Sequence, residues 1–245
     1  MQCGVINTIF PGAGVLTCHA AGLCYSSGGN WKGYPKRLQG MIPNLGVFLM
    51  RVLIGCEHSG VIRDKFIAAG HDAWSCDLLP TEVEGPHHQG DIFDIIDNDW
   101  DLAILHPPCT DIAVSGAAPF AKKIADGRQQ RALDFVTALW DTSIPKMCIE
   151  NPVSVISTKT KLGKPSQIIQ PYEFGHPESK RTCLWLRGLN HLNPTKILPK
   201  PECGYWENQT PSGQNKLGPS KDRWKKRSKT YDGIAQAMCN QWGDL

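Results

Sequence analysis

The sequence predicts an α/β fold built on a mostly parallel sheet, with helices on both faces of that sheet. From residue 50 onward, short apolar runs typical of buried strands alternate with segments whose apolar residues recur at helical spacing. Glycines and prolines separate these segments. Such an alternation is typical of consecutive βαβ units, which bind their ligands at the carboxyl ends of the strands.

The expected elements follow one another without an internal repeat. Five apolar runs are expected to be strands, at residues 51–56, 71–77, 101–108, 146–152 and 181–189. Pro107 and Pro108 stop the third strand, because proline has no N–H for a sheet ladder. Three segments have helical spacing, at residues 59–70, 126–142 and 230–242. Gly70 suits the C-terminal end of the first helix. The second helix is expected to bury the side chains of Ala132, Phe135, Val136 and Leu139.

Residues 1–49 differ from the rest of the chain. They are rich in glycine, serine and cysteine and show no sustained period of a strand or a helix. We expect this segment to be poorly ordered, or to be a translated leader upstream of a true start at Met50. The functional domain is then residues 50–245. The irregular spacing of Cys3, Cys18, His19 and Cys24 argues against a zinc site.

Composition narrows the class of protein. Hydrophobic residues make up 41% and charged residues 20% of the chain, which is ordinary for a soluble globular domain. No run approaches the roughly 20 apolar residues of a membrane span, so we expect a cytoplasmic protein with no membrane partner. The ten cysteines include no CxxC pair, which favours a reduced protein without a metal site. Four cysteines in apolar runs are expected to be core residues: Cys56, Cys76, Cys148 and Cys183.

Three features in order along the first part of the domain favour a nucleoside cofactor. The segment GCEHSG, from Gly55 to Gly60, follows the first strand, where a glycine turn lets the backbone approach a ligand. Asp77 ends the second strand, where a carboxylate accepts hydrogen bonds from ribose hydroxyls. Asp91, in GDIFD, is placed to accept from an adenine amino group. Each aspartate alone fits a turn or a helix cap equally well.

A cysteine and a glutamate follow or end two later strands. Cys109 in LHPPCTD comes directly after the strand that the prolines stop, where a nucleophile is well presented. Its reactive form is the thiolate, so we expect nearby cations or the following helix to lower its pKa. Glu150 in CIENP ends another apolar strand. We expect it to be either a buried partner of another group, or a general acid or base. Addition of a thiolate to C6 of cytosine is easier when N3 is protonated or hydrogen-bonded, so the two residues suit this reaction together.

These segments, in their order, resemble the motifs of the DNA cytosine-5 methyltransferase family, most closely its short phage-type members. The resemblance is carried by LIGCEHSG, GHDAWSCD, GDI, PPCT, IENP and FGHPESKRTCLWL, and covers residues 50–188 and the helix near 230–242. It implies a Rossmann-like fold that binds S-adenosyl-L-methionine and flips its target cytosine out of DNA. It also implies that the protein is located in the cytoplasm of a bacterium or of a phage-infected cell.

The resemblance assigns roles to residues of this chain. Cys109 would be the nucleophile, Glu150 the partner of cytosine N3, and Lys180 or Arg181 the cation near the target base or phosphate. The cofactor contacts it implies are Gly55, Glu57, Gly60, Asp77, Asp91, Ile92 and Pro108. The first turn departs from the family pattern, since Cys56, Glu57 and His58 replace its aromatic residue and closely spaced glycines.

The segment 189–226 is short for a target-recognition region. It contains Tyr205, Trp206 and Trp224 among lysines and arginines, a composition that suits phosphate contact and base stacking. The alternative is a solvated loop whose aromatic side chains pack onto the domain. The net charge of +3 is too small to identify DNA as the partner by itself, although KDRWKKRSK concentrates cations at residues 221–229. A monomer is favoured.

Three other functions fit parts of the sequence. The chemistry of Cys109 and Glu150 would also serve modification of a free pyrimidine nucleotide, which would explain the short segment 189–226. The second alternative is a non-catalytic DNA-binding relative, although such a protein would not need to retain both Cys109 and Glu150. An amino-methyltransferase is disfavoured, because such enzymes place Asp or Asn before the two prolines and an aromatic residue after them.

Overall fold

The computed structural model describes residues 49–116, 119–218, 220–221 and 223–244, and three short strands before residue 27. The chain divides into two compact units, Met1–Val47 and Phe48–Leu245. In the first unit, β1 (Ile6–Phe10), β2 (Ala13–Cys18) and β3 (Cys24–Ser26) form an antiparallel sheet. The sequence pattern did not predict these strands. The other residues up to 48 lie outside the described part of the chain. The expectation that residues 1–49 are a poorly ordered or non-native extension therefore stays a prediction.

The second unit is built on a seven-stranded sheet of order β6-β5-β4-β7-β8-β10-β9. Its parallel strands are β4 (Arg51–Gly55), β5 (Asp72–Asp77), β6 (His87–Gln89), β7 (Leu102–Leu105) and β8 (Lys146–Pro152). At one edge, β10 (Thr182–Arg187) runs antiparallel to β8, and β9 (Gln167–Ile169) runs antiparallel to β10. The fold is therefore α/β and Rossmann-like with a mostly parallel sheet, as predicted.

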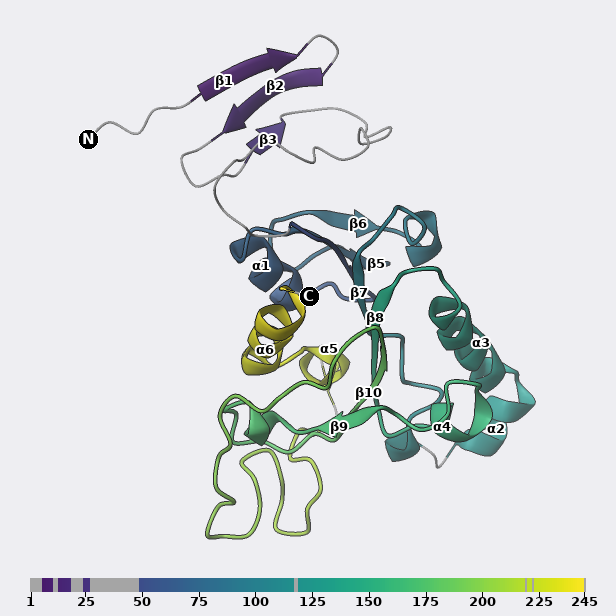
Figure 1. The fold of residues 1–245 in the computed structure, drawn as a ribbon. Helices are drawn as coiled ribbons and strands as arrows, with labels where there is room; N and C mark the ends of the chain where they lie inside the picture. The colour runs from purple at the N-terminus through teal and green to yellow at the C-terminus, as the bar shows by residue number, and fades with distance from the viewer. Residues whose placement is uncertain are drawn as a thin grey trace. The chain divides into compact units, whose positions relative to one another are not determined.

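Helices cover both faces of the sheet (Figure 1). On one face, Val52 and Ile54 of β4 pack in one core with α1 (Val61–Ala68) and α6 (Asp232–Trp242). On the other face, Leu53 of β4 packs in a second core with α3 (Arg128–Trp140). Successive side chains of a strand point to opposite faces, so a continuous apolar run supplies both cores.

The remaining helices are short and lie in the connections. They are η1 (Ile92–Asp94), η2 (Val114–Gly116), α2 (Phe120–Ala125), α4 (Ile156–Lys159), η3 (Pro171–Glu173) and α5 (Arg223–Ser228). Among the described residues, no helix is long and apolar enough to cross a membrane. Within the same part of the chain, no cluster of three His, Cys, Asp or Glu side chains is arranged to hold a metal ion.

The structure confirms the five strands and three helices predicted for the domain and corrects some details. The strand at 101–108 ends at Leu105, before both prolines. In α3, Leu133 is fully buried although it was not among the predicted inward residues, whereas Ala132 and Phe135 are only partly buried. Three of the four cysteines predicted for the core are buried, but Cys56 is only partly buried and has a positive φ of 57°.

Candidate active site

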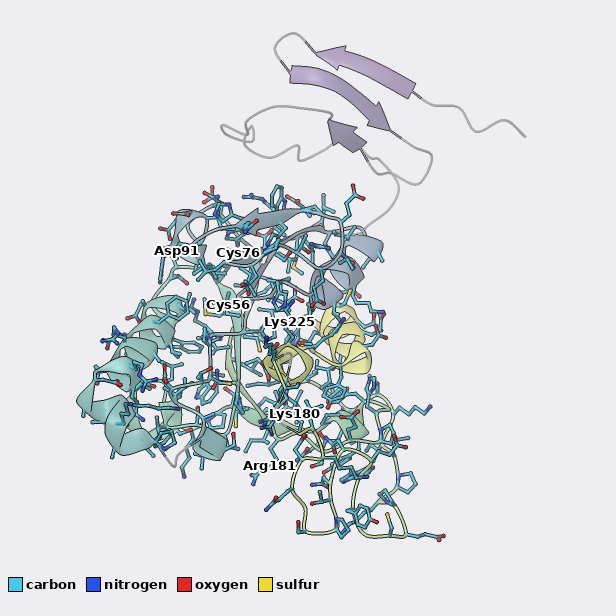
Figure 2. All side chains as sticks on the ribbon, turned by 180° about the vertical axis from the view of Figure 1, so that it is seen from behind. Cys56, Cys76, Asp91, Lys180, Arg181 and Lys225 are labelled. Carbon is cyan, nitrogen blue, oxygen red and sulfur yellow. The ribbon has the colours of Figure 1, made fainter. Side chains whose placement is uncertain are left out.

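The candidate site lies along the carboxyl ends of the central strands. From β4 the chain crosses outward to β5 and β6, and it then returns to β7 on the opposite side of β4. The carboxyl ends of β4 and β7 thus meet at a topological switch point, which is where α/β sheets bind ligands. Figure 2 shows Asp91 and Cys76 toward the β5–β6 side of the molecule, and Lys180 and Arg181 toward the β10 side.

Hydrogen bonds to both flanking strands hold the segment that carries Cys109. The His106 N–H donates to the Gly55 carbonyl at 2.9 Å, which ties the segment to β4. The Asn151 side chain on β8 donates to the Pro107 carbonyl at 2.8 Å. The Cys109 carbonyl accepts from the N–H groups of Ile112 and Ala113, at 3.1 and 2.8 Å. Cys109 is therefore presented from a turn whose two ends are fixed.

The thiol of Cys109 does not have the lowered pKa that the sequence analysis expected. Burial raises the pKa of Cys109, and the negative charge of Glu150 raises it further. The charges of Lys180 and Arg227 act in the opposite direction but are outweighed. The thiol form therefore dominates near neutral pH, and formation of the thiolate depends on a change in this charge balance.

Glu150 lies at the carboxyl end of β8 with a side chain that is only 15% exposed. His106 Nδ1 donates a hydrogen bond to its Oε2 at 2.9 Å. Burial alone would raise the pKa of Glu150, but the hydrogen bond from His106 and the positive charge of Lys180 outweigh burial and lower it. Glu150 is thus an ionised carboxylate near neutral pH. His106 is a partner that the sequence analysis did not assign.

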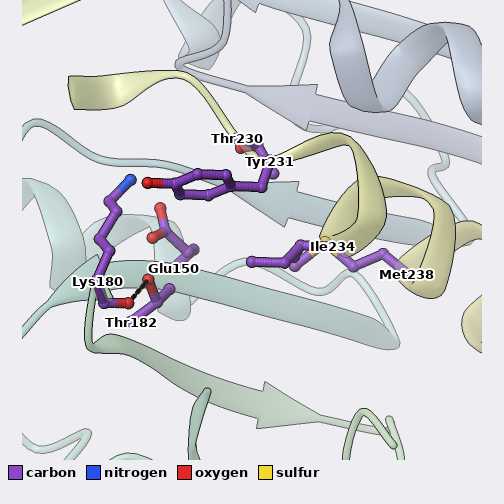
Figure 3. A pocket seen from close by; sticks show the side chains of 7 residues that line it. All are labelled: Glu150, Lys180, Thr182, Thr230, Tyr231, Ile234 and Met238. Atoms are coloured by element: carbon purple, nitrogen blue, oxygen red, sulfur yellow. Dashed lines mark hydrogen bonds between the residues drawn. The ribbon is translucent and has the colours of Figure 1, made fainter. Parts of the chain in front are cut away.

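A pocket opens beside Glu150 (Figure 3). Its lining comes from the end of β8, from the start of β10 and the residues before it, from the segment before α6 and from α6 itself: Glu150, Lys180, Thr182, Thr230, Tyr231, Ile234 and Met238. The Lys180 ammonium lies 5.9 Å from the centre of the Tyr231 ring, and the Tyr231 hydroxyl donates to Glu178 at 2.5 Å. The pocket combines a cation, a carboxylate and an aromatic ring. The structure thus brings Glu150 and Lys180 together, while the Arg181 side chain is exposed.

Local packing and backbone conformation constrain the two predicted glycines of the first turn. A Cβ at Gly55 would lie 2.3 Å from the end of the Ile92 side chain and 2.6 Å from that of Leu105, so these side chains would have to shift to admit a larger residue. Gly60 has a φ of 74°, and a Cβ there would lie 2.7 Å from the Arg63 guanidinium. Gly60 is therefore a glycine for conformational reasons as well. These contacts explain both glycines without a ligand.

Asp77 and Asp91 each use one carboxylate oxygen in a local turn. Asp77 accepts from the N–H of Leu79 at 2.9 Å, and Asp91 caps η1 by accepting from the N–H of Phe93 at 3.0 Å. The second oxygen of Asp77, Oδ2, lies 3.8 Å from His58 Nδ1. These contacts do not exhaust either group, because an ionised carboxylate has two oxygens and about four lone-pair sites. Asp91 is exposed and Asp77 is partly exposed, so both remain accessible to a ligand.

One oxygen of the Glu57 carboxylate in this turn lacks a hydrogen-bond donor among the described residues. Glu57 is 6% exposed, and its Oε1 accepts a short hydrogen bond from the Ser59 hydroxyl. Its Oε2 is buried and has no hydrogen-bond partner among the described residues. Buried carboxylate oxygens are normally paired. Together with Asp77 and Asp91, Glu57 supplies acceptors that fit the amino and hydroxyl donors of a nucleoside cofactor.

Arg63 of α1 positions this region, and sequence reasoning missed it. The side chain is fully buried. It donates to the Ser75 hydroxyl at 3.1 Å and to the carbonyls of Val83 and Glu84 at 3.2 and 3.3 Å. It therefore fixes the loop that follows Asp77, the last residue of β5. A lone arginine within an amphipathic helix gives no sequence signal of such a role.

The segment 189–226 is partly fixed to the domain. The Trp206 ring is buried and stacks on Tyr172 with ring centres 4.5 Å apart. The Asn208 side chain exchanges two hydrogen bonds with the backbone of Ser179, at 3.0 and 2.9 Å. Trp206 thus packs onto the domain, as the alternative interpretation expected, and is not a free stacking surface. The Trp224 side chain lies outside the described part of the structure.

Comparisons with known proteins do not assign a family. Neither a protein-family model nor a curated protein matches the chain. Among solved structures, the chain is similar to the methyltransferase EhMeth of Entamoeba histolytica, with 16% sequence identity and a TM-score of 0.42. The similar region covers 62% of this chain and 58% of that protein. Likeness at this level carries no functional argument, so the case for function depends on the geometry of the site.

Proposed function

We propose that this chain is an S-adenosyl-L-methionine-dependent methyltransferase that acts on C5 of cytosine in DNA, with Cys109 as its nucleophile. The observation that carries the proposal is that Cys109, in the turn after β7, lies near Glu150, which is near the carboxyl end of the adjacent parallel strand β8. The two groups are close enough for the charge of Glu150 to raise the pKa of the Cys109 thiol. Asn151 ties the two strand ends together through Pro107.

Each residue has a role that follows from its chemistry. The Cys109 thiolate would add to C6 of the cytosine, and Glu150 would hold the N3 and exocyclic-amine edge of the base. Lys180 would stabilise negative charge beside the base and favour the thiolate. Bound S-adenosyl-L-methionine would supply the methyl group. Glu57, Asp77 and Asp91 would hold its amino and hydroxyl groups.

DNA is proposed as the substrate because of the cations around the pocket. Lys180 lines the pocket itself, and Arg227 of α5 lies close enough to Cys109 to lower its pKa. Arg223, Lys225 and Lys229 lie on or beside the same short helix. Cations spaced along a segment suit a polyphosphate backbone, and the affinity should then fall steeply with salt.

The test is methyl transfer from labelled S-adenosyl-L-methionine, followed by nucleoside analysis of the product. With double-stranded DNA we expect 5-methyl-2′-deoxycytidine, and deoxycytidine monophosphate should be a much poorer acceptor. Preference for the mononucleotide would support the pyrimidine-nucleotide alternative. A product methylated on the exocyclic amine, or no transfer at all, would contradict the proposal.

A further inference from the structure

The imidazole of His106 occupies a position that the proposed chemistry has not yet used. It lies between the end of β7 and Pro107, with its backbone N–H bonded to the Gly55 carbonyl. Its side chain is only 10% exposed, and Nδ1 lies 2.9 Å from Glu150 Oε2. The other ring nitrogen, Nε2, is buried and has no hydrogen-bond partner among the described residues. The ring is therefore held by its contact with Glu150 and by the backbone.

We propose that His106 is a positioning and proton-holding residue, which supplies through Glu150 the proton that cytosine N3 takes up when Cys109 adds to C6. This inference rests on the proposed function and deepens it. His106 acts through Glu150 and does not itself contact the base.

The need for such a residue follows from hydrogen-bonding roles. N3 of neutral cytosine is an acceptor, and an ionised carboxylate is also an acceptor, so the two cannot bond unless a proton lies between them. Because the pKa of Glu150 is lowered, this group alone rarely carries a proton near neutral pH. A histidine can carry one in this range, since its ordinary pKa is about 6.5.

The transfer balances in protons and charge. The S–C6 bond forms from the thiolate electron pair, and the C5–C6 π electrons move into the ring. At the same time an N–H bond of the His106 imidazolium breaks and an N3–H bond forms, while Glu150 passes the proton on and ends as a carboxylate. One negative and one positive charge disappear together, which leaves a neutral adduct beside a neutral imidazole. When Cys109 leaves, the proton returns by the same route.

Several other titratable or charged groups face Glu150 and affect this balance. Around Glu150 they are Cys109 after β7, Cys148 on β8, Cys183 on β10, Lys180 before β10 and Tyr231 at α6, whereas Arg227 on α5 acts on Cys109. Burial raises the pKa of both Cys148 and Tyr231, so neither supplies a proton carrier in the neutral range. The positive charge of Lys180 stabilises the carboxylate of Glu150.

The test uses His106→Asn and His106→Ala in the full chain. Asparagine keeps an N–H near the position of Nδ1 but cannot carry a proton, whereas alanine removes the hydrogen bond as well. His191→Asn is a matched control, because His191 is exposed. The first readout is the titration of the Glu150 carboxyl carbon by NMR in the free protein. The pKa of Glu150 should rise in both variants, and more in the alanine variant, because contributions that lower it are removed.

The second readout is the pH profile of single-turnover methylation of DNA. His106→Asn should slow the reaction by roughly a hundredfold, the usual size of a general-acid contribution. The pH profile of the rate should change as well, with DNA and cofactor affinities unchanged. An unaltered rate and profile in His106→Asn would overturn the inference, and so would an unaltered Glu150 titration in His106→Ala. If the wild-type protein transfers no methyl group to DNA, the proposed function fails, while the NMR titration still decides whether His106 controls the proton on Glu150.

Discussion

Replacing Asn151 by alanine tests whether β8 holds the Cys109 turn in place. Asn151 is 1% exposed, and its Nδ2 donates a hydrogen bond to the carbonyl of the buried Pro107 at 2.8 Å. Removing the Nδ2 donor leaves the Pro107 carbonyl without this hydrogen bond, which should lower the free energy of unfolding by about 1–3 kcal/mol. With a urea slope of about 2 kcal/mol per molar, a loss of 2 kcal/mol lowers the unfolding midpoint by roughly 1 M.

The assay is urea unfolding followed by tryptophan fluorescence, together with methylation of DNA. Asn240→Ala is the matched control, because Asn240 is exposed on α6 and its side chain bonds, among the described residues, to the side chain of Gln236. That control should shift the free energy of unfolding by no more than about 0.5 kcal/mol. The Asn151→Ala variant should also lose methylation activity, because the Pro107 carbonyl that Asn151 holds lies two residues before Cys109. A midpoint equal to that of the control, with full activity, would refute the argument that this bond positions the nucleophile.

Three further predictions concern other parts of the site. Glu150→Gln should lower the pKa of the Cys109 thiol, because it removes a charge that raises it. Site-specific alkylation followed by mass spectrometry should then show faster reaction of Cys109 at neutral pH, and an unchanged rate would contradict the charge coupling. Asp91→Asn should keep the cap on Phe93 yet weaken cofactor binding by roughly tenfold to a hundredfold, because it loses a charge-assisted hydrogen bond of about 1.5–3 kcal/mol. Calorimetry that shows an unchanged affinity would remove Asp91 from the site. A chain that starts at Met50 should fold and bind cofactor like the full chain, and insolubility or lost binding would show that the first 49 residues belong to the functional unit.

The parts of the fold that were predictable are those with a strong local signal. The buried parallel strands are continuous apolar runs, and the prolines after Leu105 mark the end of β7 closely. The antiparallel direction of β10 was not predictable, because a strand buried on both faces has the same pattern in either direction. The short strands β6 and β9 were also missed, since three residues carry no period.

The candidate site was likewise predictable only in part. The positions of Cys109 after one strand and Glu150 at the end of another were enough to predict that the two residues belong to one site, and in the structure they are close enough for the charge of Glu150 to act on the Cys109 thiol. The sequence did not reveal the sign of the Cys109 pKa shift, because that sign depends on burial and on the distance to Glu150 relative to Lys180 and Arg227. His106 and Arg63 were missed for a related reason. Each acts through a partner more than ten positions away in the sequence, and no local spacing records that contact.

Trapping of the covalent intermediate tests the central claim most directly. DNA that contains 5-fluorocytosine has no C5 proton to lose, so an adduct between Cys109 and C6 should persist after methyl transfer. With S-adenosyl-L-methionine present, we predict a protein–DNA species that survives denaturing electrophoresis and whose peptide map places the link at Cys109. Cys109→Ser should abolish both the adduct and methylation, because a serine hydroxyl is a far weaker nucleophile without strong activation. Methylation that continues in Cys109→Ser would contradict the account.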